Sequence, residues 1–173
     1  AMTAAKSMFG AAEMSEYGFY MGGFSTVPAG VDTNYEYNPF TDAWATRTAI
    51  PTATNTPGCA SDDDNGRVYL FGGNTVEGNV DTTRYYTKHT DAWATDTSSP
   101  VTMTNHVPQT YEHGMYVCGG NFGGQPATNV YRFNISPTAP TAFYVESYKG
   151  YVFLARTSGQ PSAVFYSLPG DAR

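Results

Sequence analysis

The chain has 173 residues, of which 14% are charged and 15% aromatic, and its formal net charge is −6. The aromatic and β-branched content excludes a disordered chain, because such chains lack these residues. Only nine lysines and arginines are present, and they are scattered. A phosphate backbone requires a basic stripe, so we expect neither nucleic-acid binding nor membrane attachment. No apolar run approaches the roughly 18 residues of a membrane-spanning helix.

Glycine, proline, asparagine and threonine interrupt the chain every few residues, which breaks helices and favours turns. Between these breaks lie short aromatic and β-branched runs that predict buried strands. In chain order they are Tyr17 to Met21, Arg67 to Phe71, Gly114 to Cys118 and Gly150 to Leu154. The expected fold class is therefore all-β.

The sequence contains an internal repeat. The segment Val31 to Thr48 returns as Val80 to Thr97, with 11 of 18 positions identical. A third copy is weaker, because Thr128 to Asn134 is followed by Ser136 to Thr141 and no tryptophan. A partial fourth copy ends the chain. We predict a single domain, 1–173, with approximate repeats 1–50, 51–98, 99–141 and a partial 142–173.

Each repeat predicts four strands. In the second repeat we expect them near Gly58 to Ser61, Arg67 to Phe71, Thr82 to Thr87 and Trp93 to Thr97. Repeated four-stranded units of this length are typical of β-propeller blades, and a large aromatic side chain on each blade packs against the next blade. The repeat signature comprises glycine doublets, tyrosines, aspartates and tryptophans: Gly22, Gly23, Tyr37, Asp42, Trp44, Gly72, Gly73, Tyr86, Asp91, Trp93, Gly119 and Gly120.

A glycine doublet, a tyrosine roughly thirteen residues later and a tryptophan seven residues after that resemble the kelch repeat. This resemblance covers nearly the whole chain. It implies a kelch-like β-propeller, or a partial propeller, of about three and a half four-stranded blades. The style of the repeats is similar to kelch-like repeats of bacteriophage tail-fibre and other virion proteins. It is less similar to the intracellular adaptors that carry a helical companion domain.

The resemblance implies a non-enzymatic structural or receptor-binding component of a phage virion, in the tail or a tail fibre. Its variable loops after the glycine doublets would contact neighbouring virion proteins or a host surface glycan. Two phenylalanines at like positions could stack on a sugar, although packing over the blade is the favoured interpretation. The candidate ligand-binding residues are Phe24, Ser25, Asn74, Glu77, Asn121 and Phe122.

Residue types that carry catalysis or bind metals are poorly arranged. The spacing of His89, His106 and His113 matches no zinc or copper pattern. The acids in the turn Asp62 to Gly66 are consecutive, which favours a solvated tight turn over a calcium loop. For Cys59 and Cys118 a bridge, two thiols and a metal site are all open, and two buried free thiols are favoured. We expect no catalytic residue, metal or cofactor.

The length raises a question about closure, because propellers close with roughly four to eight blades. The chain could be part of a longer one, or copies of itself or other virion proteins could complete its open ends. Two other functions remain open. One is a carbohydrate-binding propeller domain of a secreted, extracellular bacterial protein. The other, less favoured, is a fragment of a galactose-oxidase-like enzyme.

Overall fold

The computed structural model describes residues 5–25, 30–112, 114–134, 142–148, 151–157 and 164–166. Within these residues the chain is all-β, with several antiparallel sheets and no helix, as predicted. None of the described segments forms a helix that could cross a membrane. The chain divides into two compact units, Ala1–Ser136 and Pro137–Arg173. This division lies close to the boundary expected between the third repeat and the partial fourth.

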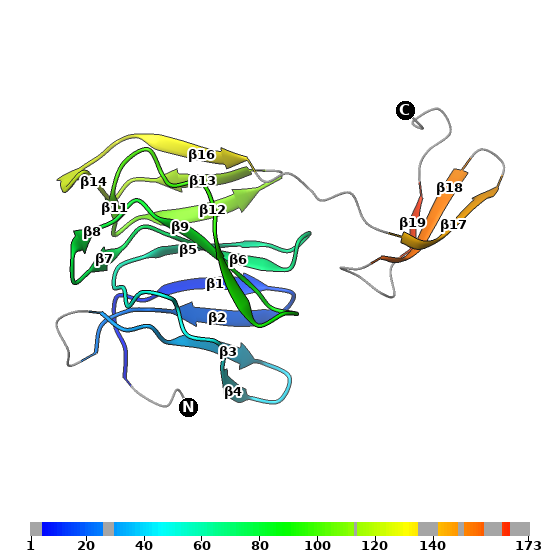
Figure 1. Ribbon diagram of the computed structural model, residues 1–173, viewed down its shortest axis with the longest axis horizontal. Helices are drawn as coiled ribbons and strands as arrows, with labels where there is room; N and C mark the ends of the chain where they lie inside the picture. Colours follow the sequence, from blue (N-terminus) through cyan, green and yellow to red (C-terminus); the bar gives the residue numbers. More distant parts are fainter. Residues whose placement is uncertain are drawn as a thin grey trace. The chain divides into compact units, whose positions relative to one another are not determined.

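Three larger sheets form most of the described part of the first unit (Figure 1). Sheet 1 consists, in spatial order, of β1 (Gly10–Met14), β2 (Tyr17–Met21), β3 (Asn34–Asn38) and β4 (Ala43–Thr46). Sheet 2 consists of β5 (Gly58–Asp62), β6 (Arg67–Phe71), β9 (Thr83–Thr87) and β10 (Ala92–Thr95). Sheet 3 consists of β12 (Val107–Tyr111), β13 (Gly114–Cys118) and β16 (Val130–Asn134). The four strands expected in the second repeat are confirmed to within a few residues.

Two segments that the sequence predicts as loops form small antiparallel hairpins instead. One consists of β7 (Asn74–Thr75) and β8 (Gly78–Asn79). The other consists of β14 (Asn121–Phe122) and β15 (Gln125–Pro126), and β14 also pairs with β11 (Met103–Thr104). Their strands are too short to show an alternating pattern, so the sequence signals only a polar turn.

The second unit contains one three-stranded antiparallel sheet. Its strands, in spatial order, are β17 (Ala142–Tyr148), β18 (Tyr151–Thr157) and β19 (Val164–Tyr166). The strand predicted at Gly150 to Leu154 corresponds to the start of β18.

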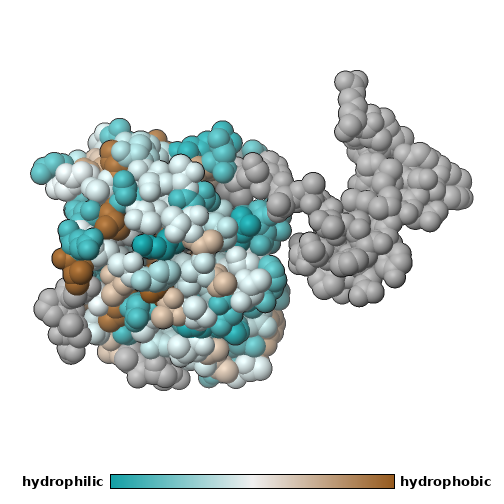
Figure 2. Space-filling model, in the orientation of Figure 1, coloured by the Kyte–Doolittle hydropathy of each residue, from teal (hydrophilic) through white to brown (hydrophobic). Residues whose placement is uncertain are grey.

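The three sheets of the first unit pack face to face, with β1 beside β5 and β5 beside β12 (Figure 1). One apolar cluster joins sheets 1 and 2: Met14, Phe19, Met21, Ile50, Cys59, Val68, Leu70 and Tyr86. A second joins sheets 2 and 3: Ala60, Tyr69, Phe71, Met103, Met115 and Val117. Apolar residues visible in Figure 2 lie in small groups among polar ones on the described surface.

The central strand β6 contributes to both clusters. Val68 and Leu70 belong to the cluster shared with sheet 1, whereas Tyr69 and Phe71 belong to the one shared with sheet 3. Successive side chains of a strand point to opposite faces, so both faces of β6 are buried. This explains why the run Arg67–Phe71 is continuously apolar after its first residue rather than alternating.

Each of these sheets has two faces. We call the face on which the signature tyrosine position lies the tyrosine face, and the other one the opposite face. The tyrosine face of sheet 2, with Tyr86, packs on the opposite face of sheet 1, with Phe19. Phe133 of sheet 3 corresponds to Tyr86, because Met115 pairs with Phe133 as Val68 pairs with Tyr86. Its ring centroid lies 4.7 Å from that of Phe71 on the opposite face of sheet 2. The same packing is therefore used twice.

The second glycine of a doublet lies where the next repeat crosses. Gly73 N–H donates to Met103 O (2.8 Å), and the φ angle of Gly73 is +101°. A Cβ atom there would overlap Thr54 Oγ1 and lie 2.9 Å from Asn55 O. Glycine is thus required by both the backbone angle and the close approach of Thr54 and Asn55.

The residue two positions before the first strand of each of these three sheets adopts a left-handed conformation. Met8, Thr56 and Asn105 have φ angles of 53°, 54° and 54°. They link successive repeats, because Thr56 N–H donates to Met8 O (2.8 Å) and Asn105 N–H donates to Thr56 O (3.2 Å). A positive φ is most unfavourable for a β-branched residue, whereas asparagine tolerates it. Thr56 is therefore the strained member of the three.

Replacing Thr56 by asparagine, the residue found at the same place in the third repeat, is expected to stabilise the protein by about 1 kcal/mol. The hydroxyl that is lost makes only a long hydrogen bond, 3.4 Å from Thr56 Oγ1 to Asn55 Oδ1. Chemical denaturation measures the change, and the reverse substitution Asn105→Thr should lower stability by a similar amount. Equal stability of Thr56→Asn and the parent protein would show that the left-handed threonine carries no strain.

Candidate functional site

The residues that follow the glycine doublets of sheets 2 and 3 gather at one end of those sheets, where Figure 1 shows β7, β8 and β14 together. Asn74 lies in β7, and its Nδ2 donates to Asn79 Oδ1 (2.7 Å) across the hairpin. Glu77 is exposed in the turn between β7 and β8. This end of the two sheets presents polar groups, the Glu77 carboxylate and the exposed Val76 side chain to the solvent.

The remaining candidate ligand-binding residues are half-buried. Phe24 N–H donates to Ser7 O (2.6 Å) in an isolated bridge, and Ser25 follows it. Asn121 and Phe122 lie in β14. The Phe122 ring centroid is 5.3 Å from that of Tyr131, and Phe122 packs against the cluster between sheets 2 and 3. Phe122 thus has a packing role, and ligand binding at these loops stays a prediction.

The histidines are dispersed in the described part of the chain. His89 is exposed in the turn before Trp93, at the place of the exposed Phe40 in the first repeat, as expected for a variable surface position. His106 is buried, and His113 lies outside the described residues. Among the residues that the structure describes, no three side chains of His, Cys, Asp or Glu come together as metal ligands.

The acidic turn Asp62 to Gly66 uses its first two carboxylates for structural hydrogen bonds. Asp62 accepts from the backbone N–H of Asn65 (3.3 Å) and from its Nδ2 (2.7 Å). Asp63 accepts from the backbone N–H of Ser15 in sheet 1 (2.9 Å). Burial raises the pKa of both carboxyl groups. These contacts favour the tight-turn interpretation and add a link between two sheets.

Both cysteines are free thiols, but only one is buried. Burial raises the pKa of Cys59 to about 12, so this thiol is unreactive at neutral pH. The expectation of a second buried thiol is wrong for Cys118, which is exposed. Its neighbour Val117 packs between sheets 2 and 3, so Cys118 points to the opposite face of sheet 3.

A hydrogen-bonded group of signature residues fixes β9 and β10 of sheet 2 to sheet 1. Tyr86 Oη donates to Asp91 Oδ1 (2.6 Å), which also accepts from the backbone N–H of Thr48 (3.0 Å). Trp93 Nε1 donates to Thr48 O (2.9 Å), and its ring lies 5.5 Å from that of Tyr86. Both polar groups of the Thr48 backbone are thus bound by residues of the next repeat.

The pKa values of Asp91 and Tyr86 are shifted by their hydrogen bond to each other. The hydrogen bond from Tyr86 is the main reason that the pKa of Asp91 lies below its usual value, and the nearby charge of Arg47 adds to it. Burial, followed by the hydrogen bond to Asp91, raises the pKa of Tyr86. In the first repeat Tyr37 Oη donates to Asp42 Oδ1 (2.9 Å) in the same way. The signature tyrosine and aspartate therefore form a pair in both complete repeats.

Arg47 is held in place by a buried carboxylate. Its Nε and Nη2 atoms donate to the two oxygens of Glu36, at 3.1 and 3.0 Å. Lys88 of sheet 2 completes the group, with its Nζ 3.7 Å from Glu36 Oε1 and 3.0 Å from the centre of the Tyr17 ring. This fixed guanidinium places a positive charge beside Asp91.

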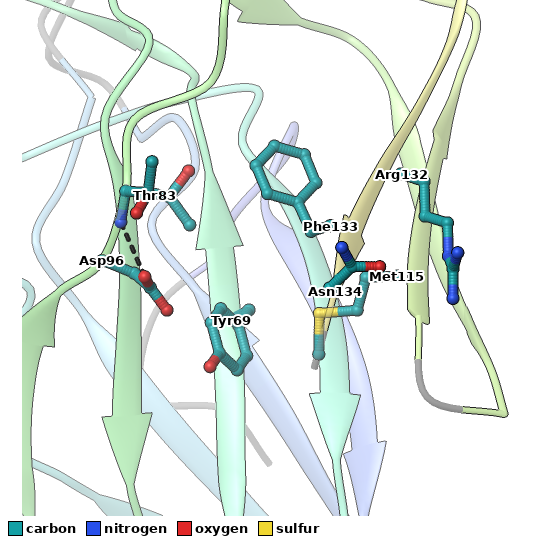
Figure 3. Close-up of a pocket in the computed structure, with 8 residues that line it drawn as sticks. Tyr69, Thr83, Asp96, Met115, Arg132, Phe133 and Asn134 are labelled. Atoms are coloured by element: carbon teal, nitrogen blue, oxygen red, sulfur yellow. Dashed lines mark hydrogen bonds between the residues drawn. The ribbon is translucent and has the colours of Figure 1, made fainter. Parts of the chain in front are cut away.

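A pocket of about 310 Å³ lies between sheets 2 and 3 (Figure 3). In Figure 3, Thr83 and Asp96 lie on one side of Tyr69, with Phe133 and Asn134 on the other. Arg132 extends away from them, and its guanidinium lies 5.8 Å from the centre of the Tyr116 ring. Burial raises the pKa of Tyr69 to about 12. The lining residues are Tyr69, Thr83, Asp96, Thr97, Met115, Arg132, Phe133 and Asn134.

This pocket corresponds to the place that Trp93 fills between sheets 1 and 2. Asp96 N–H donates to Thr83 O (2.9 Å) as Arg47 N–H donates to Asn34 O (2.9 Å), so Thr97 corresponds to Thr48. No residue that lines this pocket stands out in the sequence. The usable signal was the third repeat, which has phenylalanine at the tyrosine position and no tryptophan after it.

No family model matches the chain, and no curated protein matches it.

Proposed function

We propose that the first unit is a kelch-like partial β-propeller and that the chain is a non-enzymatic structural or receptor-binding component of a bacteriophage virion, in the tail or a tail fibre. The observation that carries this proposal is the character of the two end faces of the three-sheet stack. Both present apolar side chains of the kind that the internal repeats bury against each other. Such faces favour a subunit that is completed by neighbours in an assembly.

The tyrosine face of sheet 1 is one of these ends. Its signature side chain, Trp44, packs on Tyr20 and Tyr37, with ring centroids 5.0 and 4.9 Å apart. The equivalent face of sheet 2 is covered by sheet 1, whereas no further described sheet of the first unit packs on this one. Its aromatic surface suits a second sheet of the same kind, since that is what covers Tyr86.

The opposite face of sheet 3 is the other end. Val107, Cys118 and Val130 lie side by side in register across its three strands. The exposed fractions of Val107 and Val130 are 72% and 59%. Tyr111 on the same face is also exposed. The residues at the corresponding positions of sheet 2 are buried. The exposed apolar row on sheet 3 therefore favours contact with a binding partner.

Self-association through these ends is a testable consequence. We expect the apparent mass in multi-angle light scattering to rise with protein concentration, and Val130→Lys to shift the association constant at least tenfold toward the monomer, because it places a charge in the apolar row. Val76→Lys is the matched control, since Val76 is 75% exposed but lies in the β7–β8 turn. A concentration-independent monomer, or equal effects of the two substitutions, would contradict the end-face interpretation.

The virion role is tested separately. Antibodies raised against the first unit should label tails or fibres of purified phage particles in immunogold electron micrographs. Mass spectrometry of the same particles should find the chain in a constant ratio to the known tail proteins. Particles that contain no such chain would overturn the proposed role, whatever the association measurements show.

A further inference from the structure

In the described part of the chain, sheet 3 has three strands where sheets 1 and 2 each have four. β16 pairs with β13 along one edge, as β9 pairs with β6. On its other edge β9 pairs with β10, the strand that carries Trp93. Among the described residues the corresponding edge of β16 has no paired strand. Its backbone N–H and C=O groups can therefore pair with a strand from another chain.

The pocket lies where a strand at this edge would deliver an aromatic side chain. Between sheets 1 and 2 the Trp93 indole packs on Tyr86 and donates to Thr48 O. The corresponding residues, Phe133 and Thr97, line the pocket. Its other apolar walls are Tyr69 and Met115. This combination of apolar walls and one backbone acceptor suits an indole.

The charge around the pocket differs from that around Trp93. Asp91 is held by the Tyr86 hydroxyl, by the Thr48 N–H and by the nearby charge of Arg47. None of these has its equivalent at the pocket, and the basic lining residue, Arg132, extends away from the other labelled side chains (Figure 3). Phe133 has no hydroxyl, Thr97 N–H already donates to Asp96 Oδ1 (2.7 Å), and Asp96 stands at the place of Arg47. An acidic residue in the incoming strand would be repelled here, and a basic residue would be attracted.

We propose that the edge of β16 away from β13 and the adjoining pocket bind an extended segment of another protein with the sequence pattern basic-x-Trp. The segment pairs antiparallel with β16, its indole enters the pocket and donates to Thr97 O, and its basic side chain lies beside Asp96. The inference rests on the internal repeats and not on the virion role, so either can fail without the other.

Peptides based on the chain's own β10 test this directly. The native peptide has the sequence of residues 88–97, a second carries Asp91→Lys, and a third carries both Asp91→Lys and Trp93→Ala. Each is titrated into the ¹⁵N-labelled full chain, and amide shifts of β16 are followed. We expect the Asp91→Lys peptide to bind about two- to fivefold more tightly than the native one. Removal of the indole should weaken binding at least tenfold, as expected for a buried aromatic anchor.

A charge reversal in the protein is the decisive control. Asp96 is exposed, and the first repeat has arginine at its place, so Asp96→Arg should leave the fold intact. This substitution should reverse the preference, with the native peptide then binding more tightly than Asp91→Lys. Glu77→Arg, a charge reversal in the β7–β8 turn, should leave the order unchanged. The proposal would be overturned if no peptide shifted the amide signals of β16. It would also be overturned if the order of peptide affinities did not change on removal of the indole or on the substitution Asp96→Arg.

Discussion

Replacing Gly73 by alanine is expected to lower the free energy of unfolding by about 3–5 kcal/mol, a sum of backbone strain and steric overlap. The φ angle of +101° lies outside the region that alanine adopts readily. The added methyl group would also meet Thr54 Oγ1 and Asn55 O in the segment that precedes β5. Both groups belong to a hydrogen-bonded crossing that joins sheets 1 and 2, so they cannot withdraw without breaking it. Urea denaturation followed by far-UV circular dichroism measures the loss.

Gly78→Ala is the matched control. Gly78 has a φ angle of +108°, close to that of Gly73, but no atom lies within 4 Å of the Cβ that alanine would add. It therefore carries the backbone cost alone, about 1–2 kcal/mol. If the two substitutions destabilise the protein equally, the close approach at Gly73 contributes nothing and the doublet is conserved between repeats only for its backbone angles.

The strands were predictable because burial against a neighbouring sheet leaves a short apolar and aromatic run in the sequence. The runs Tyr17–Met21, Arg67–Phe71 and Gly114–Cys118 match β2, β6 and β13. Each is the second strand of its sheet and packs on at least one neighbouring sheet. Their length and the following glycine doublets mark both ends. The repeat itself was predictable because identical packing was required twice.

The hydrogen bonds of the signature residues were only partly predictable. Aspartate at a turn suggests a bond to a nearby backbone N–H. Asp91 instead accepts from Thr48, in the preceding repeat, and from the hydroxyl of Tyr86. Local sequence cannot indicate such a partner, because it depends on how one sheet lies on the next.

The pocket between sheets 2 and 3 could not be predicted from the residues that line it. Tyr69 and Phe133 appear in the sequence as ordinary core residues, and Asp96 as an ordinary exposed acid. The pocket arises because the third repeat has no counterpart of Trp93. Only a comparison of the three repeats indicates it, because the third copy lacks this tryptophan. The exposure of Cys118 was missed for a related reason. It depends on which face of sheet 3 is covered by another sheet.

Acidification from pH 7 to pH 4 is expected to destabilise the protein by up to about 3 kcal/mol through His106 alone. This side chain is 5% exposed, where sheet 3 meets Gly58 of sheet 2. Burial lowers its pKa from 6.5 to about 4. Between these two values the unfolded chain binds a proton that the folded chain does not, so stability falls as the pH drops through this window. Below about pH 4 both states are protonated and the contribution levels off.

The contribution of His106 can be separated from that of the carboxylates by substitution. Phe9 occupies the same place in the first repeat, because it immediately precedes β1 as His106 immediately precedes β12. His106→Phe therefore introduces a side chain that this position already accepts elsewhere. Its unfolding free energy, measured by urea denaturation between pH 7 and pH 4, should fall by about 3 kcal/mol less than that of the parent protein. His89→Gln, at an exposed position, should follow the parent curve. Parallel curves for the parent and His106→Phe would mean that this histidine is protonated in the folded state with little cost, and that the junction of sheets 2 and 3 admits water.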